Sequence, residues 1–581
     1  MQSLVIAPVL SGTFFCEEAI VQAVADEDTA ARVCAHLCST AASRIEAALS
    51  AIGPKVSPSG EYQLGYTLIV PLFRYFQKVD GAWTLDVETL RANMQTISEV
   101  DRPVVVHLSG THFTFSGVEF SRELAQDERN LQWTRSGPAV PSDYFNVPIV
   151  AWTLADTNAP VNVARREAMN AAIDALCDLP ASARERIVAV SVLGETHDIF
   201  PSLVDGPTYG LRPEQLTDYS PIMADRFRDW LNERYGTIDL INQHLCASFP
   251  SFESIQPPSR DLRTEAVDSF FEHFDDYAAG KVDIYGWVHD QRGRPLTVKV
   301  LLDGQEAGTA EMGFSRTDVT EALSLTEANV GFRYGLDFRQ LPFGHHTVEV
   351  LVSAEGEMPL FLAKCELVHI DRHMSPWEHV SVAVSGAAPM SSDTSLRGSL
   401  DGPGGGQVSI FYNPLADLWL QFRNLVVRQY VEDFASIAGK SCIPTSKVFT
   451  HQISPVLYGG WNSDILAVES SLMPSERYTP GTTLYGGAAS GDAFLAMKQR
   501  LGWSTYGVTE MHPVTPMADG DYAAMFDLHR RAGAAFVAPY YMEVPTGHPR
   551  GGDLERFRIA PDNPRYGSDL FYHSIKVVMT R

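Results

Sequence analysis

Two acidic side chains stand at the ends of apolar stretches where a charge has no packing role. Glu195 follows the stretch IVAVSVLG, and Glu510 ends the stretch YGVT. Charged side chains are rarely buried without a partner, so glutamates in these places indicate a functional site. Two carboxylates that flank one glycosidic bond can cleave it, one as nucleophile and the other as acid. The alternative is that both glutamates form structural salt bridges.

Polar and aromatic residues near the ends of the other apolar stretches could bind a polyhydroxylated substrate. Neutral histidines donate hydrogen bonds to hydroxyl groups, and aromatic rings stack on pyranose faces. His197 lies two residues after Glu195 and therefore on the same face if the strand continues. The candidate substrate-binding residues are His112, Trp152, His197, His451, Gln452, Trp461, Asn462, Tyr485, His512 and Tyr540.

The same histidines permit a second chemistry, hydrolysis assisted by a metal ion. Its six candidate ligands are Glu195, His197, Glu510, His512, His112 and His451. The first expected strand lacks the closely spaced histidine pair that metal-dependent barrel hydrolases favour, so we expect no metal and no cofactor. Cys34 and Cys38, with His36 between them, are a weaker metal hypothesis because no second ligand pair accompanies them.

Two blocks of apolar strands alternating with amphipathic helices would position these residues. The expected strands are residues 66–73, 103–113, 147–156 and 187–197 in the first block, and 446–453, 482–488, 504–513 and 534–544 in the second. Strands of continuous Val, Ile and Leu character predict a parallel sheet covered on both faces. Eight of them predict a (β/α)8 TIM barrel, with catalytic groups at the carboxyl ends of the strands. Glu195 then ends strand four and Glu510 ends strand seven.

The sequence between the two blocks has a different pattern. Alternating strands and the hairpin signal Asp303-Gly304 predict an inserted all-β sandwich. It could bind sugar, form a subunit interface or wall the cleft. Apolar residues at helical spacing predict a helix over residues 16–52. The expected domains are a helical N-terminal segment (1–60), the first half of the barrel (61–274), the sandwich (275–372), and a linker with the second half of the barrel (373–581).

The stretch FRDWLNERYGTIDLINQHLCASFPSFESIQPP (227–258) resembles the segment that follows the acid/base strand in family 42-type β-galactosidases, which are clan A retaining glycoside hydrolases. The resemblance implies that Glu195 is the general acid/base, that Glu510 is the nucleophile, and that the substrate is a β-glycoside, with a galactoside favoured. One position departs from the clan, which places Asn before the acid/base where this chain has Gly194. Either another residue such as His197 contacts the sugar 2-hydroxyl, or the substrate differs there, or Glu195 is not the acid.

Net charge and cysteine content narrow the classes of partner. A net charge of −26 disfavours nucleic acid and anionic membrane surfaces, and no apolar run is long enough to span a bilayer. We expect an oligosaccharide or polysaccharide substrate, with a homo-oligomer left open. Seven scattered cysteines show no disulfide framework, which favours a cytoplasmic location, or a periplasmic or secreted one if a leader has been removed. A non-hydrolytic protein of polysaccharide synthesis, binding or transferring glycans, is the alternative from another class.

Overall fold

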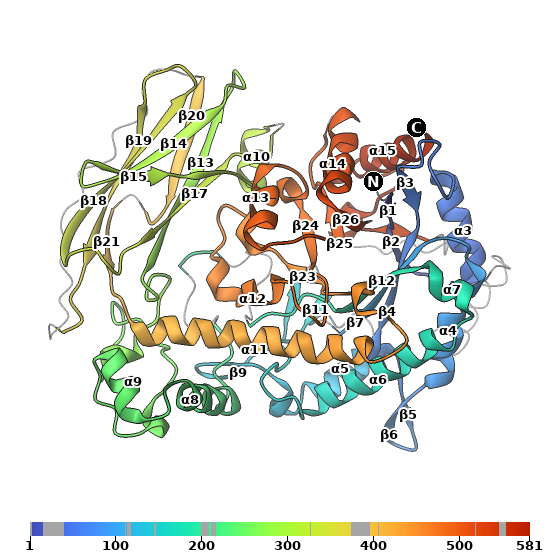
Figure 1. Ribbon diagram of the computed structural model, residues 1–581, viewed down its shortest axis with the longest axis horizontal. Helices are drawn as coiled ribbons and strands as arrows, with labels where there is room; N and C mark the ends of the chain where they lie inside the picture. The colour runs from blue at the N-terminus through green and yellow to red at the C-terminus, as the bar shows by residue number, and fades with distance from the viewer. Residues whose placement is uncertain are drawn as a thin grey trace.

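The fold is a closed parallel barrel with an inserted β unit beside it (Figure 1). The computed structural model describes residues 3–14, 40–110, 112, 118–144, 147–198, 208–210, 216–325, 327–373, 395–404, 406–517, 519–544 and 553–581. Both chain termini lie at the edge of the barrel remote from the β unit. Helix α11 (Pro414–Gly439) runs from the base of the β unit along the barrel and joins the two parts.

Eight parallel strand positions form the barrel in the described part of the chain. In order they are β1 (Leu4–Ile6) with β2 (Val9–Ser11), β3 (Tyr62–Leu64) with β4 (Tyr66–Pro71), β7 (Val104–Ser109), β12 (Ile187–Leu193), β22 (Val448–Phe449) with β23 (Gln452–Ile453), β24 (Gly481–Tyr485), β25 (Tyr506–His512), and β26 (Ala534–Pro539) with β27 (Met542–Glu543). Each position pairs in parallel with the next, and the last pairs with the first to close the ring. The predicted (β/α)8 barrel is confirmed.

The strand count was correct because two errors cancelled. The first strand is β1 and β2, within the segment expected to be helical, where Pro8 interrupts a short apolar run. Residues 147–156 were expected to form strand three, but only β11 (Val147–Ile149) is a strand there, and it pairs antiparallel with β10 (Ser142–Tyr144). A short apolar run can be a buried connection as readily as a strand. Strands four to eight therefore carry their predicted numbers.

Helices cover the outside of the barrel, and side chains fill its interior. Thr40 caps α3 and Asn413 caps α11 through their side-chain oxygens. Residues 16–39, including Cys34 and Cys38, lie outside the described part of the expected N-terminal helix, of which α3 is the end. Besides α11, the helices are α3 (Ala41–Ile52), α4 (Val87–Glu99), α5 (Val118–Leu124), α6 (Pro160–Cys177), α7 (Ala181–Arg186), α8 (Pro221–Tyr235), α9 (Ile238–Leu245), α10 (Thr317–Leu323), α12 (Glu469–Leu472), α13 (Asp492–Arg500), α14 (Asp519–Ala532) and α15 (Ser568–Thr580). The interior core includes Val5, Val105, Ala189, Phe449 and Phe536.

The inserted β unit consists of two sheets with their own hydrophobic core. Its strands are β13 (Lys281–Asp290), β14 (Leu296–Leu302), β15 (Gln305–Thr309), β16 (Glu311–Phe314), β17 (Gly331–Asp337), β18 (Gly344–Ala354), β19 (Leu360–His369), β20 (Leu396–Gly402) and β21 (Gln407–Ile410). The sheets have the orders β16-β17-β13-β20 and β15-β14-β18-β19-β21. Ile284, Val298 and Val350 are almost fully buried between them. The domain boundaries themselves remain predictions.

Part of the stretch expected to be a linker belongs to this β unit. Residues 385–407 are rich in Gly, Ser and Pro, but β20 and β21 pair with β13 and β19. A glycine here serves close strand packing, because a Cβ on Gly398 would lie 2.8 Å from the carbonyl oxygen of Trp287. Composition alone therefore gave a wrong prediction at β20.

A disulfide joins Cys177, the last residue of α6, to Cys442 beyond the end of α11. The two residues are 265 positions apart, with their Cα atoms separated by 5.7 Å. The expectation of no disulfide was wrong, because sequence spacing does not reveal which distant helix ends meet. The compartment, which was inferred from that expectation, stays a prediction.

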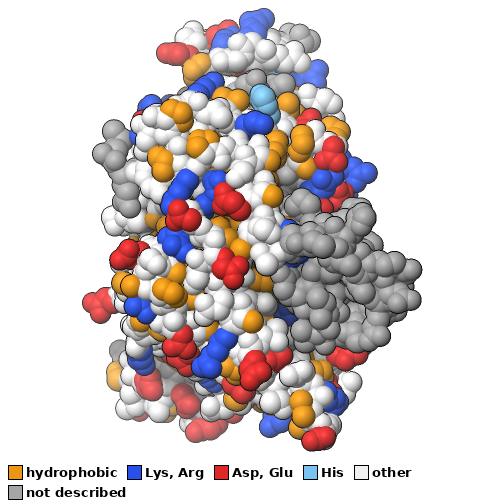
Figure 2. Space-filling view, turned by 90° about the vertical axis from the view of Figure 1, so that its right-hand side faces the viewer, with side chains coloured by type: hydrophobic (Ala, Val, Ile, Leu, Met, Phe, Trp, Pro, Cys, Tyr) orange, Lys and Arg blue, Asp and Glu red, His pale blue; other side chains and the backbone are white. Residues whose placement is uncertain are grey.

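The surface carries charges of both signs. On the face in Figure 2, acidic and basic side chains are interspersed, with hydrophobic side chains scattered among them. The net charge of −26 is therefore not gathered into one patch on this face. Among the described helices, none is long and apolar enough to cross a membrane.

Candidate active site

Glu195 and Glu510 lie at the carboxyl ends of the fourth and seventh barrel strands. Glu195 follows β12 after a sharp turn, in which Leu193 has φ 66° and Gly194 has φ 121°. A side chain at position 194 would be strained at that angle, because the left-handed region at φ near 120° is essentially confined to glycine. The backbone conformation at position 194 therefore explains why glycine precedes Glu195. Glu510 lies within β25, and its side chain keeps 21% of its accessible surface.

Each glutamate accepts a hydrogen bond from a hydroxyl group on β24. Thr483 donates from Oγ1 to Glu195 Oε1 over 3.0 Å, and Tyr485 donates from its phenol to Glu510 Oε2 over 2.6 Å. Thr483 and Tyr485 are two residues apart, so they project from the same side of the strand. One strand therefore supplies a donor to both carboxylates.

The two carboxylates influence each other electrostatically. Burial raises the pKa of Glu195, the negative charge of Glu510 raises it further, and the hydrogen bond from Thr483 opposes the rise. Burial also raises the pKa of Glu510, but the hydrogen bond from Tyr485 opposes that rise. Like charges held together in partial burial disfavour double ionisation. The pair is therefore suited to hold one proton between its two carboxyl groups.

A row of buried neutral histidines reaches Glu510 from inside the barrel. His451 lies between β22 and β23, and its Nε2 is 3.5 Å from Glu510 Oε1. Its ring centroid is 4.2 Å from that of His107, whose Nδ1 is 3.0 Å from the hydroxyl of Ser191. Burial lowers the pKa of His451 to about 3 and that of His107 well below its ordinary value. Both are neutral near pH 7, and only His451 lies beside Glu510.

Gln452 holds the loop that follows Glu195 by bonding to Thr196. It is 1% exposed, accepts a hydrogen bond from the Thr196 amide over 3.3 Å, and donates to the Thr196 carbonyl over 2.7 Å. Its amide also donates to Ser471 Oγ over 2.9 Å. Because both ends of its amide are already bonded to protein groups, its position favours support of the loop over contact with substrate.

Three other predicted substrate-binding residues lie in buried packing. Trp152 is 3% exposed and packs edge-on against Phe73 at 6.1 Å. Asn462 donates to Asp276 over 3.0 Å and accepts from the amide of Asp464. His512 is fully buried, and its ring nitrogens bond to the Ser568 hydroxyl and the Val514 amide. The pairing register of β25 with both neighbouring strands shifts near Glu510.

The remaining predicted residues lie around the two glutamates. The His112 and His197 rings are 5.1 Å apart, and burial lowers the pKa of His112 well below its ordinary value. Tyr540 meets the ring of Tyr485 edge-on at 6.1 Å. Tyr540 thus contacts the residue that bonds to Glu510, and His112 and His197 pack against each other.

Trp461 has an aromatic partner that sequence reasoning missed. The Tyr458 ring stacks on Trp461 with centroids 4.3 Å apart, and its hydroxyl accepts a hydrogen bond from the Tyr485 amide over 3.1 Å. Burial raises the pKa of Tyr458, and the negative charge of Glu195 raises it further. The signal was available, because Tyr458 and Trp461 share the glycine-rich turn YGGW.

Two further features bear on ligand binding. Among the described residues, no group of three or more His, Cys, Asp and Glu side chains is arranged to hold a metal ion. A cavity of about 430 Å³ lies between α11 and the inserted β unit, lined by residues that include Lys281, Arg339 and Asp464. Neither Glu195 nor Glu510 lines it, so it is separate from the paired carboxylates.

A closed barrel with paired carboxylates after strand four and on strand seven has the architecture of the TIM-barrel glycosidases. Residues 210–278 match the model of the glycoside hydrolase family 42, described as beta-galactosidase. The predicted resemblance to that family is confirmed, and the match supports the expected glycoside hydrolase. The search of curated proteins found no match.

Solved structures with some similarity include glycosidases. The β-galactosidase of the Antarctic haloarchaeon Halorubrum lacusprofundi is 17% identical, with a TM-score of 0.24, over 34% of this chain and 25% of that one. The β-galactosidase of the psychrophilic Marinomonas ef1 is 15% identical, with a TM-score of 0.26, over 46% and 31%. The catalytic domain of the Paenibacillus polymyxa β-amylase is 10% identical, with a TM-score of 0.42, over 89% and 91%. The aligned part thus spans only about a quarter to a third of the first two β-galactosidases.

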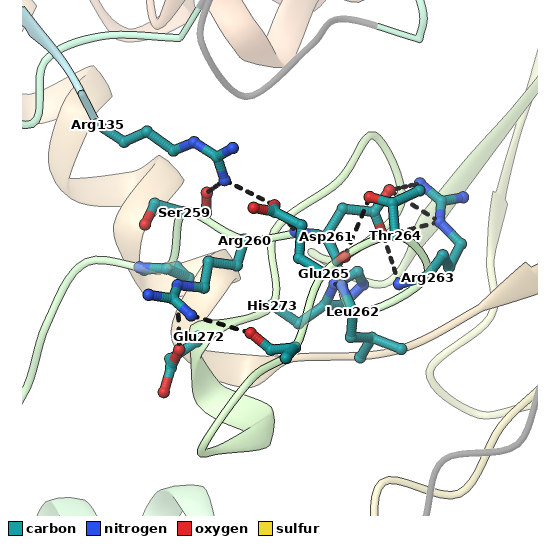
Figure 3. Close-up of polar contacts among 12 residues, drawn as sticks. Arg135, Ser259, Arg260, Asp261, Leu262, Arg263, Thr264, Glu265, Glu272 and His273 are labelled. Carbon is teal, nitrogen blue, oxygen red and sulfur yellow. Dashed lines mark hydrogen bonds and ion pairs between the residues drawn. The ribbon is translucent and has the colours of Figure 1, made fainter.

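The segment that matches the family model contains α8, α9 and the connection to the inserted β unit. Figure 3 shows how ion pairs hold this connection. Arg135 bonds to Glu265 over 2.6 Å and to the carbonyl of Ser259 over 3.0 Å. Arg263 bonds to Asp261 and lies 3.0 Å from Asp275. These contacts tie the connection between α9 and the inserted β unit to the barrel.

Proposed function

We propose that this chain is a retaining glycoside hydrolase in which Glu510 is the nucleophile and Glu195 is the general acid/base. The observation that carries the proposal is the unequal environment of the two carboxylates. Glu510 receives the phenol of Tyr485, which favours its ionised form, and lies beside the neutral ring of His451. Glu195 receives one hydroxyl and faces the charge of Glu510, which favours its protonated form.

The reaction has two steps. In the first, a Glu510 oxygen attacks the anomeric carbon, the glycosidic C–O bond breaks, and Glu195 gives its proton to the leaving oxygen. In the second, Glu195 takes a proton from water, whose oxygen attacks the anomeric carbon and releases Glu510. Both residues return to their starting protonation states, and the product keeps its anomeric configuration. No cofactor takes part in either step.

The substrate we propose is a β-glycoside, with a galactoside favoured by the match to a family described as beta-galactosidase. The aromatic stack of Tyr458 and Trp461 offers a face for a sugar ring. With Gly194 unable to contact the sugar 2-hydroxyl, we assign that contact to His197, whose ring packs against His112.

Replacement of the nucleophile tests the assignment. Glu510→Ala should lose turnover of aryl β-glycosides by several orders of magnitude, and added azide should restore product as the inverted glycosyl azide. Glu469→Ala removes an exposed glutamate on α12 and serves as the matched control, with unchanged turnover expected. Unchanged turnover in Glu510→Ala would refute its role as nucleophile.

The same assays separate the alternatives. Hydrolysis releases free reducing ends, whereas a transglycosylating protein would make longer glycans from the same oligosaccharide. A metal-dependent hydrolase would lose activity to a chelator, whereas a two-carboxylate enzyme would keep it. We expect free reducing ends and no effect of EDTA.

A further inference from the structure

The inserted β unit bonds directly to the barrel loops that carry the aromatic residues beside the glutamates. Ser315, next to β16, pairs with the turn after strand five. Its amide donates to the carbonyl of Leu457 over 2.9 Å, and its carbonyl accepts from Gly459 over 3.0 Å. The Ser315 hydroxyl also accepts a hydrogen bond from the Gly487 amide, after strand six, over 3.1 Å. One residue of the insert thus holds two loops of the barrel.

Arg333, on β17, also bonds to this turn. Its Nη2 donates to the carbonyls of Tyr458 over 2.7 Å and Trp461 over 2.9 Å. The guanidinium lies 5.0 Å from the centre of the Phe314 ring, and the residue is 8% exposed. Its nearest acceptors are therefore main-chain carbonyls of the turn, whose conformation depends on this side chain. A planar guanidinium can donate to several acceptors at once, which a lysine ammonium does in a less fixed geometry.

This turn is linked to the nucleophile through one intermediate residue. Tyr458 accepts the Tyr485 amide, and Tyr485 donates its phenol to Glu510. Trp461 lies stacked on Tyr458 and is half-buried, so part of its surface remains accessible. The contacts of Arg333 therefore end at an aromatic surface two hydrogen bonds away from the reacting carboxylate.

We propose that the inserted β unit is a wall of the substrate site and that Arg333 is a positioning residue, which sets the Tyr458–Trp461 stack as a platform for a sugar ring. The proposal rests on the proposed function and extends it to substrate binding. In this proposal the β unit affects sugar binding by positioning the Tyr458–Trp461 turn of the barrel. It needs no sugar-binding face on its own sheets. Aromatic stacking is sensitive to ring position, so movement of the turn should weaken binding more than it slows bond cleavage.

The test compares Arg333→Met with wild type. We expect KM for oligosaccharide substrates to rise at least about tenfold, as the loss of buried hydrogen bonds implies, with a smaller change in kcat. Arg333→Lys should recover part of the loss. Arg294→Met is the matched control, because Arg294 pairs with Asp290 and Glu357 inside the same β unit. It should keep the wild-type KM.

A binding measurement keeps the test independent of catalysis. In Glu510→Ala, lactose binding followed by tryptophan fluorescence should weaken by a similar factor when Arg333→Met is added. If Arg333→Met does not fold, Trp461→Ala provides the second variant and should give the same KM-dominated loss. In a double-mutant cycle, the two losses should be less than additive, because both remove the same platform.

The outcomes separate the two proposals. Wild-type KM in Arg333→Met and in Trp461→Ala would overturn the platform proposal while leaving the Glu510 assignment intact. Lactose binding that is lost in Trp461→Ala while Glu510→Ala keeps full turnover would support the platform and refute the proposed mechanism. Failure of the protein to bind lactose and larger galactosides would overturn the platform proposal.

Discussion

The phenol of Tyr485 donates a hydrogen bond of 2.6 Å to Glu510 Oε2. The two residues lie on neighbouring barrel strands, β24 and β25, so the contact depends on the pairing register of the two strands. Burial and the charge of Glu510 raise the pKa of Tyr485 well above its ordinary value, and the phenol therefore remains a donor. The contact opposes the rise that burial causes in the pKa of Glu510.

Tyr485→Phe should shift the acid limb of the pH profile upwards. The hydrogen bond lowers the pKa of Glu510, so its removal raises that pKa, and the ionised nucleophile is then lost at a higher pH. A hydrogen bond to a charged group contributes about 1.5–3 kcal/mol, which corresponds to roughly a 10- to 100-fold loss in kcat/KM. The measurement is kcat/KM against pH for an aryl β-glycoside.

Tyr334→Phe is the control for this experiment. Its hydroxyl donates to the carbonyl of Ala307 within the β unit and contacts no residue of the site. It should leave both limbs in place. An acid limb in Tyr485→Phe that stays fixed or moves to lower pH would contradict the role given to the phenol.

Gln452→Met should weaken acid catalysis selectively. Its side chain bonds to both the amide and the carbonyl of Thr196, the residue after Glu195. The loss of both bonds frees the loop that holds the acid, and each unsatisfied buried group costs about 1–3 kcal/mol. Substrates with poor leaving groups need protonation, so their kcat/KM should fall roughly 10- to 100-fold. Activated aryl glycosides should be affected much less.

The matched control for that experiment is Gln421→Met on α11. Gln421 is exposed and accepts a hydrogen bond from Arg234 away from the glutamates. Equal losses for good and poor leaving groups in Gln452→Met would indicate general destabilisation and contradict selective support of the acid.

The barrel and its two glutamates could be predicted because long apolar strands reveal themselves in sequence. Glu195 and Glu510 were placed at strand ends by the charge that interrupts such a run. The first strand was missed because Pro8 divides it into two three-residue pieces, β1 and β2, each too short to show a pattern. The later strands kept their correct numbers only because residues 147–156 were counted as a strand in its place.

The hydrogen-bond donors to the two glutamates were harder to predict from the sequence. Thr483 and Tyr485 share a strand face at period two, which is a local signal, but which carboxylate each meets depends on the register between strands. Arg333 reaches the Tyr458–Trp461 turn across 125 residues of sequence, from a different unit of the fold. No local pattern encodes such a contact, because it exists only after the β unit docks on the barrel.

Loss of the Cys177–Cys442 disulfide should lower thermal stability without changing the chemistry. The bond closes a loop of 265 residues between the ends of α6 and α11, and such a crosslink typically contributes about 2–4 kcal/mol. The double variant Cys177→Ser, Cys442→Ser should lose roughly 2–3 °C in Tm. Its kcat/KM at 25 °C should match wild type. Cys246→Ser, at an exposed unpaired cysteine, should leave Tm unchanged, and an equal fall there would contradict the assignment.

The basic limb of the pH profile should belong to Glu195 and not to a histidine. Burial raises the pKa of Glu195, so the protonated acid persists above the ordinary carboxyl range and activity falls as pH rises through that raised pKa. Burial lowers the pKa of His451 to about 3, so His451 is already neutral on both sides of that limb. Carboxyl ionisation depends weakly on temperature, whereas imidazole ionisation depends on it strongly. We therefore expect a basic limb that barely moves between 15 and 35 °C, survives in His451→Gln and disappears in Glu195→Gln. A limb that moves with temperature and vanishes in His451→Gln would transfer the acid role to the histidine.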